Sequence, residues 1–280
     1  MISIEHLTFQ YQNGKKNALE EINLTIEDGD FLGIIGESGA GKTTLTQTIN
    51  GIIPHHHRGD YYGSVKIDGQ DTFDKTPSEL ALAVGSVFQD IDSQMVSSVV
   101  EDELLYGLEN FSISREEIEE RVSSSLEAVG ISHLRNRNID TLSGGQKQKV
   151  AIAAIIALKP KILVLDEPTG ELDPKSSLQI FQMLTELNQK YGITVIVVEQ
   201  KIMLLCEFAK HLAVMRDGKL ILHGTIRDVL EKNELLEQIG INCPRVVTLS
   251  NVLRTKGASV EKVCISVDEA EKMARGLICD

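Results

Sequence analysis

The sequence lacks a long apolar run. Its longest uninterrupted stretch of apolar residues, 150–158, has nine residues, whereas a helix that crosses a bilayer needs roughly 20. The N-terminus, MISIEHLTFQ, also lacks the basic and then apolar pattern of a secretory signal. We therefore expect a chain that does not cross a membrane by itself.

Cysteine and positive charge are both scarce. The four cysteines are scattered without a CxxC spacing (Cys206, Cys243, Cys264 and Cys279), which argues against a disulfide framework or a zinc site and favours reduced thiols in a cytosolic protein. Lysine and arginine number 28 against 41 aspartates and glutamates, for a net charge of −13. Because nonspecific binding to nucleic acid requires a basic surface, we expect no nucleic-acid partner.

Strand and helix patterns alternate over most of the chain. Apolar and polar residues alternate in the first thirty residues, with turns at 13–14 and 28–29, and this pattern predicts an antiparallel β subdomain. Beyond it, strands are predicted at 31–35, 84–88, 161–165 and 193–198, and helices at 42–50 and 174–190. Such alternation indicates an α/β core with a mostly parallel sheet.

Residues 89–145 break this alternation and are interpreted as an inserted helical subdomain. Ser114, followed three residues later by Glu117, has the spacing of a capping box and predicts a helix over 114–130. Residues 226–280 are expected to form a separate tail of short helices and at most one strand.

GESGAGKT, residues 36–43, follows a predicted strand and precedes a predicted helix. It matches GxxxxGK[ST] in the context that this pattern requires. Glycines allow backbone N–H groups to point at phosphate oxygens, and the helix adds its positive N-terminal end. Lys42 would reach the outer phosphates and Thr43 would offer its hydroxyl to Mg²⁺. The predicted nucleotide-binding residues of this loop are Gly36, Glu37, Ser38, Gly39, Ala40, Gly41, Lys42, Thr43 and Thr44.

Two carboxylates follow a second apolar strand. Asp166 and Glu167 come directly after the run 162–165. In a phosphate-binding site of this kind an acid at the strand end holds Mg²⁺, so Asp166 joins Thr43 as a predicted metal ligand. Glu167 would orient and polarise the attacking water, which makes it the predicted catalytic carboxylate. The alternative is a pair of solvated carboxylates that cap a strand.

Residues 142–146, LSGGQ, lie between these two motifs. LSGGQ is the signature of the ATP-binding-cassette ATPases, and the chain resembles that family over roughly residues 1–225. The resemblance implies a P-loop NTPase domain that uses ATP and Mg²⁺. It also implies sites shared between two chains, because the family's signature contacts the γ-phosphate of ATP held by the partner; the matching residues here are Ser143, Gly144, Gly145 and Gln146. Ser143 equally fits a plain serine-capped helix start.

Other positions match the family in order. Tyr11 lies where the family places an aromatic that stacks on adenine. Gln89 matches the glutamine that touches Mg²⁺ and the attacking water, so it is predicted as both a metal ligand and a catalytic residue. The plainer alternatives are a tyrosine at a hairpin edge and a polar residue at a strand end. Asp173 matches the loop that passes between subunits, and with Pro174 it also fits a helix N-cap.

One position departs from the family pattern. After the strand 193–198 the family usually has a histidine that contacts the γ-phosphate, and Gln200 stands in its place as the third predicted catalytic residue. Glutamine exchanges hydrogen bonds but takes up no proton at neutral pH. The resemblance therefore implies ATP binding with slowed hydrolysis at this site, and it favours a heterodimer with a histidine-bearing partner over a homodimer. The presence of Glu167 argues against an inactive site.

Residues 89–110, QDIDSQMVSSVVEDELLYGLEN, are similar to the ATPase subunits of energy-coupling factor transporters, the cobalt and vitamin importers. The tail segment 243–250, CPRVVTLS, also resembles that branch. This likeness implies an ATP-hydrolysing subunit on the cytoplasmic face of the cell membrane, bound peripherally to a transmembrane coupling protein and a substrate-capture membrane protein. The tail 226–280 would help to pair the two ATPases.

Three consecutive histidines at 55–57 invite a metal-site interpretation. Consecutive histidines in an extended loop point in different directions and seldom close one site, so we expect an exposed loop, with a metal site as the alternative.

Two other functional classes stay open from the sequence. One is a nucleotide-gated binding module, in which ATP only assembles the complex. The other is a cassette ATPase of another transporter class, or one acting in translation or DNA repair. The last kind usually carries two cassettes or a long coiled-coil insertion, whereas this sequence has a single GxxxxGK[ST] and a single LSGGQ.

Overall fold

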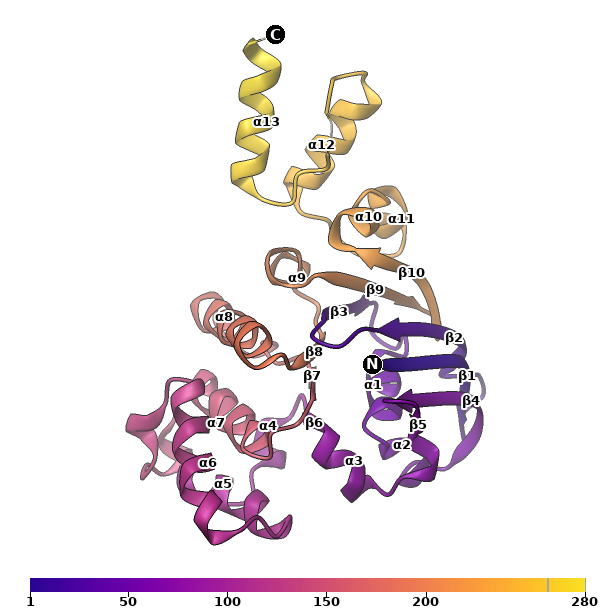
Figure 1. Ribbon diagram of the computed structural model, residues 1–280. Coiled ribbons are helices and arrows are strands. Elements are labelled where there is room, and N and C mark those ends of the chain that lie inside the picture. Colours follow the sequence, from indigo (N-terminus) through magenta and orange to yellow (C-terminus); the bar gives the residue numbers. More distant parts are fainter. Residues whose placement is uncertain (261, 280) are drawn as a thin grey trace.

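The structure of the protein is a computed structural model, shown in Figure 1, and it describes residues 1–260 and 262–279. Six strands form its central sheet in the order β10-β9-β3-β8-β7-β6, and all pair in parallel except β10 with β9. The strands are β3 (Phe31–Gly36), β6 (Val84–Val87), β7 (Ile162–Asp166), β8 (Thr194–Val198), β9 (His211–Arg216) and β10 (Lys219–Thr225). Parallel strands are covered on both faces, and every residue of β7 and β8 is buried.

The central sheet separates two apolar cores. Phe31 and Ile35 of β3 pack on the side of α8 (Pro174–Tyr191), where the Phe31 ring stacks on Phe181 at 6.2 Å between centroids. Leu32 and Ile34 pack on the opposite side, against α1 (Lys42–Ile49). The two faces alternate because successive side chains of a strand point in opposite directions.

A second, antiparallel sheet covers the α1 side in the order β2-β1-β4-β5. Its strands are β1 (Ile2–Tyr11), β2 (Leu19–Ile26), β4 (Gly59–Ile67) and β5 (Gln70–Asp71). Short helices flank the two sheets: α2 (Ile52–His55), α3 (Pro77–Ala83) and α9 (Ile202–Phe208). The predicted α/β fold, with a mostly parallel sheet and an antiparallel β portion, is confirmed.

Helices fill the chain between β6 and β7. They are α4 (Ile91–Gln94), α5 (Val100–Asn110), α6 (Arg115–Ala128) and α7 (Gly144–Ile156). The capping box expected at Ser114 is wrong: Ser114 precedes α6, but its side chain accepts no hydrogen bond from the described first turn. Glu117 instead accepts two hydrogen bonds from the Arg121 guanidinium, at 2.8 and 3.0 Å, because a charged donor outcompetes a backbone N–H.

The regular elements of the tail are helices among the residues that the structure describes, joined by turns and coil. Its elements are α10 (Ile226–Leu230), α11 (Asn233–Gln238), α12 (Arg245–Thr255) and α13 (Val267–Cys279). In Figure 1, α12 and α13 project beyond β10 and α10. Arg227 of α10 ties the tail together by donating to the Val263 carbonyl at 2.5 Å and to Glu269 at 2.6 Å.

Asn188, near the end of α8, holds the central sheet to this helix. Its buried amide donates to the carbonyls of Gly29, Asp30 and Ile193 at 2.8–3.1 Å. We expect Asn188→Ala to lower the free energy of unfolding by about 3 kcal/mol, because the Ile193 carbonyl loses its side-chain donor and the carbonyls of Gly29 and Asp30 each lose one of two donors. Denaturant titration measures this, with Gln189→Ala on the exposed face of α8 as the control. Equal stability of both variants would contradict the argument.

Candidate nucleotide-binding and hydrolytic site

The loop between β3 and α1 is shaped by glycines. Gly39 and Gly41 have φ angles of 78° and 100°, in the left-handed region that favours glycine. Lys42 folds back over this loop: its ammonium donates to the carbonyls of Gly36 and Glu37 at 2.8 and 2.9 Å. The loop therefore carries a positive charge next to the N-terminus of α1, an arrangement that attracts an anion.

The Lys42 side chain is buried, and this burial lowers the pKa of its ammonium, while the nearby carboxylates of Glu167 and Asp166 act in the opposite direction. A bound polyphosphate would add negative charge beside Lys42 and favour its protonated form.

Asp166 ends β7 next to the loop. It is 7% exposed, and burial raises the pKa of its carboxyl group, although a hydrogen bond to the Thr43 side chain and the charge of Lys42 act to lower it. The Thr43 hydroxyl thus lies close to the Asp166 carboxylate, as their predicted shared role requires.

Glu167 lies between two glutamines. The Gln89 amide donates to Oε2 of Glu167 at 3.0 Å, and the Gln200 amide donates to Oε1 at 2.7 Å. Glu167 itself has a φ of 49°, a left-handed conformation that is uncommon outside glycine. The three residues follow β6, β7 and β8, which are adjacent in the sheet. All three predicted catalytic side chains therefore meet at the carboxyl ends of parallel strands, where ligands of open α/β sheets bind.

A cavity of about 470 Å³ joins the loop to this carboxylate. The predicted residues that line it are Tyr11, Ser38, Gly39, Gly41, Lys42, Thr43, Thr44, Gln89, Glu167 and Gln200. Sequence reasoning missed further lining residues, namely Gly14, Lys15, Lys16, Asn17, Ala18, Asp217 and Gly218. The adjacent lysines 15–16, directly after the turn that follows Tyr11, were an available signal. Asp217 and Gly218 had no such signal in the sequence, because only the folded position of the β9–β10 turn brings them to the cavity.

Tyr11 stands at the end of β1 on the cavity wall. Its hydroxyl lies 3.2 Å from the Thr44 hydroxyl, and its ring meets those of Phe9 and His57 edge to face. Predicted residues Gly36, Glu37 and Ala40 lie in the same loop but do not line the described cavity.

LSGGQ lies away from the Lys42 cavity. Ser143 caps α7: its hydroxyl accepts from the Gln146 N–H at 3.4 Å, and the Gln146 side chain accepts from the Ser143 N–H at 2.9 Å. Gly144 lines a neighbouring groove of about 650 Å³, which shares Gln89, Glu167 and Gln200 with the Lys42 cavity but includes no residue of the phosphate loop. Ser143, Gly145 and Gln146 line a third hollow beside α8. One chain thus presents its phosphate loop and its LSGGQ residues to different spaces. The N-cap alternative for Asp173 is also observed, since its side chain accepts from Lys175 and Ser176.

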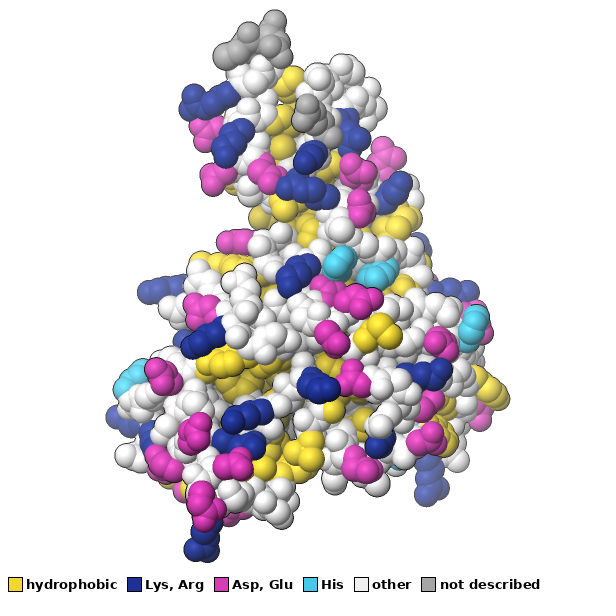
Figure 2. All heavy atoms as spheres, viewed as in Figure 1, with side chains coloured by type: hydrophobic (Ala, Val, Ile, Leu, Met, Phe, Trp, Pro, Cys, Tyr) yellow, Lys and Arg dark blue, Asp and Glu magenta, His cyan; other side chains and the backbone are white. Residues whose placement is uncertain are grey.

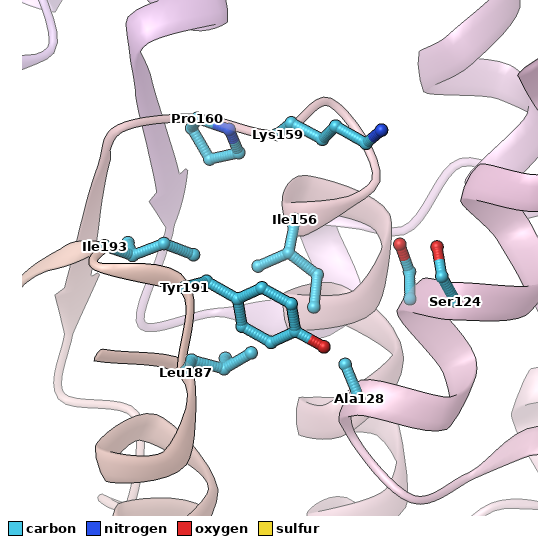
Figure 3. A pocket seen from close by; sticks show the side chains of 9 residues that line it. Ser124, Ala128, Ile156, Lys159, Pro160, Leu187, Tyr191 and Ile193 are labelled. Carbon is cyan, nitrogen blue, oxygen red and sulfur yellow. The ribbon is translucent and has the colours of Figure 1, made fainter. Parts of the chain in front are cut away.

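A further cavity of about 260 Å³ lies between α6, the end of α7 and the end of α8. Figure 3 shows its mainly apolar walls, with Leu187, Tyr191 and Ile193 on one side and Ala128 on the other. Its one charged lining residue is Lys159. This lining offers apolar contact without a set of reacting groups.

The three histidines do not converge. His55 contacts the Thr72 carbonyl at 3.3 Å, whereas the His57 ring meets Tyr11. Within residues 1–260 and 262–279, no group of three or more His, Cys, Asp or Glu side chains is placed to hold a metal ion. Likewise, none of the described helices is both long and apolar enough to cross a membrane. On the face in Figure 2, positive and negative side chains are interspersed.

Comparison with known proteins identifies the family. The ABC transporter family model matches residues 19–170. The chain belongs to this family. An ABC cassette hydrolyses ATP, so the ATPase prediction is confirmed, and the energy-coupling factor resemblance is supported by the relatives below.

Three proteins similar to this ABC ATPase are informative about its branch and its assembly. The energy-coupling factor transporter ATP-binding protein EcfA2 of Caldanaerobacter subterraneus is 38% identical over 97% of this chain and 95% of its own length. CbiO1 of Clostridium perfringens, part of the ABC transporter complex CbiONQ, is 34% identical, with a TM-score of 0.76 over 88% of this chain and 96% of its own. A dimeric ATP-binding cassette bound to ADP and Pi is 30% identical, with a TM-score of 0.70 over 81% of this chain and 99% of its own.

Proposed function

We propose that this ABC ATPase powers an importer of the energy-coupling factor type, for a vitamin, a cofactor precursor or a transition metal. Likeness to EcfA2 along 97% of the chain supports this branch, as does the structural likeness to CbiO1. The observation that carries the ATPase site is the placement of Glu167 between Gln89 and Gln200 at the Lys42 cavity. The domain boundaries would be 1–225 for the ATPase, with 89–145 inserted, and 226–280 for the tail.

Two cassettes would close around ATP head to tail. The phosphate loop and LSGGQ of one chain face different spaces, so each would complete a site with the opposite motif of a partner cassette. The solved relative that is dimeric with ADP and Pi supports this arrangement. Tail residues 226–280 would contribute to pairing.

Hydrolysis uses the groups at the strand ends. Glu167 would accept a proton from the attacking water, and the two glutamine amides would hold its carboxylate in place. Lys42 and the N–H groups of the loop would stabilise the negative charge on the phosphates.

Mg²⁺ fits the oxygen donors that the chain offers. Thr43 and Gln89 line the Lys42 cavity, and the Asp166 side chain lies close to that of Thr43. Hydroxyl, carboxylate and amide oxygens suit this hard cation. These three residues would hold Mg²⁺, which when bound neutralises phosphate charge.

The partners and location follow from this proposal. Because none of the described helices can cross a membrane, the chain would bind peripherally at the cytoplasmic face of the cell membrane. It would dock there on a transmembrane coupling protein and a substrate-capture membrane protein. Co-expression with strongly hydrophobic neighbouring reading frames tests this: the chain should sediment with membranes only when they are present.

Gln200 favours a second candidate, a catalytically weak subunit of a heterodimer. Glutamine replaces a proton-accepting side chain yet binds Glu167 directly. We expect the wild-type chain alone to release phosphate slowly, and Gln200→His to raise kcat by about tenfold or more, since proton transfer is restored beside the γ-phosphate. Mg²⁺-dependent phosphate release measures this, with Gln200→His combined with Glu167→Gln as the inactive control. Steady wild-type turnover that Gln200→His leaves unchanged would instead favour a homodimer.

A further inference from the structure

Three consecutive side chains after β8 all reach the segment that follows β7. Gln200 binds Glu167, Glu199 binds Thr169, and Lys201 binds Thr169 and Leu172. β7 and β8 are neighbours in the sheet (Figure 1), so the two segments leave it side by side. Sequence reasoning singled out only the middle residue of the three.

Lys201 makes the largest number of these contacts. Its half-buried ammonium donates to the carbonyls of Thr169 and Leu172 at 2.5 and 3.3 Å, and to the Ser177 hydroxyl at 3.2 Å. An ammonium has three N–H donors, and here each reaches a neutral oxygen. Charge-assisted hydrogen bonds are about twice as strong as neutral ones. Lys201 therefore cross-links both ends of the loop 169–172 and the first turn of α8.

Glu199 is the acidic neighbour of Lys201, but its carboxylate is held by other donors. Its carboxylate is 1% exposed and accepts hydrogen bonds from both the N–H and the hydroxyl of Thr169. It also accepts from the N–H groups of Gln200 and Lys201, at 3.0 and 3.3 Å. The buried negative charge is satisfied by these four donors, which leaves the Lys201 ammonium free to hold the carbonyls of the loop.

The loop held by Lys201 connects two functional surfaces. It begins after Glu167, at the Lys42 cavity. It ends at Leu172, whose side chain lies against Gly144 of LSGGQ: a Cβ added to Gly144 would be 3.3 Å from Leu172 Cδ2. A shift of this loop would thus move both the carboxylate of the chain's own site and the surface offered to the partner's site.

We propose that Lys201 is a positioning residue for ATP hydrolysis, which fixes the loop 169–172 and thereby couples Glu167 to LSGGQ. This inference rests on the proposed function, in which Glu167 activates water and LSGGQ completes the partner's site. Lys201 lines the groove beside LSGGQ but not the Lys42 cavity, and its ammonium is held by three oxygens of the chain itself. Its proposed role is therefore in geometry and not in nucleotide affinity.

The first test is hydrogen–deuterium exchange of the nucleotide-free full chain. Three backbone N–H groups of the loop donate hydrogen bonds and should exchange slowly. The N–H of Thr169 donates to the Glu199 carboxylate, that of Gly170 to the Glu167 carbonyl and that of Leu172 to the Thr169 carbonyl. Lys201→Met, which keeps the side-chain length without the charge, is expected to speed exchange in 167–173 by about tenfold, because local opening becomes easier. Lys201→Arg should restore protection.

The second test is steady-state ATP hydrolysis. We expect Lys201→Met to lower kcat by about tenfold or more while KM for ATP stays within about twofold, the signature of misplaced groups and intact binding. Lys210→Met is the matched control, because Lys210 also donates to a backbone carbonyl, that of Gly29 at 2.7 Å, without contacting the loop. Ser177→Ala removes one acceptor of Lys201 and a long hydrogen bond of 3.5 Å to the Leu172 carbonyl, and it gives a milder variant should Lys201→Met fail to fold.

The outcomes distinguish a failure of the proposed role of Lys201 from a failure of the proposed function. If exchange in Lys201→Met is unchanged, Lys201 does not fix the loop 169–172, whatever the activity of the variant. Faster exchange with unchanged kcat, or parallel losses of kcat, ATP affinity and melting temperature, overturns the positioning role. Absence of hydrolysis by the wild type, alone and with a partner cassette, would instead defeat the proposed function, and the exchange result would still decide whether Lys201 fixes the loop.

Discussion

Replacing Glu167 with glutamine is expected to lower kcat for ATP hydrolysis by about 10²–10⁴-fold, the usual contribution of a general base. Glutamine keeps the size of the side chain but cannot take a proton from water. Lys42, Thr43 and the loop N–H groups are untouched, so the dissociation constant for ATP should change little. Phosphate release and equilibrium binding of a fluorescent ATP analogue measure the two quantities separately.

Glu186→Gln is the matched control for this variant. Glu186 is an exposed carboxylate on α8 that lines neither the Lys42 cavity nor the groove beside LSGGQ. Its replacement should leave both kcat and ATP binding close to wild type. Were Glu167→Gln to keep most of its turnover, the proton would have to be accepted elsewhere and the proposed role of Glu167 would be wrong.

Gly36→Ala is expected to cost at least about 3 kcal/mol of folding stability and to abolish ATP binding. A Cβ added at Gly36 would lie 2.2 Å from the Met215 carbonyl oxygen of β9, an overlap that only a backbone shift can relieve. That shift would displace the loop whose N–H groups are proposed to hold the phosphates. Thermal unfolding and ATP binding measure the two effects.

Gly39→Ala separates steric overlap from backbone strain in the same loop. Gly39 also has a positive φ, 78°, but a Cβ there would meet nothing within 4 Å. Its substitution should cost only roughly 1–2 kcal/mol, the penalty for a left-handed conformation, and should leave ATP binding measurable. Equal losses in the two variants would show that the close approach of β9 does not constrain this loop.

The sequence by itself determined the features that depend on local pattern. Apolar runs specified the buried strands, and glycines followed by Lys42 specified the phosphate loop, because period and backbone freedom are properties of short segments. Asp166 and Glu167 were predictable as neighbours of that loop, since parallel strands bring their carboxyl ends to one edge. Ser114 shows the limit of local pattern. Its spacing to Glu117 fits a capping box, but the Glu117 carboxylate accepts hydrogen bonds from Arg121 instead.

Only the tertiary structure decided contacts between segments distant in sequence. Gln200 and Glu167 are 33 positions apart, and their hydrogen bond exists because β7 and β8 pair in a register that ends both strands at the same edge. The same register places Lys201 over the loop 169–172. Asp217 lines the Lys42 cavity because β9, which precedes it, lies next to β3 in the sheet. Strand order and register are set by the packing of whole elements, which no single stretch of sequence encodes.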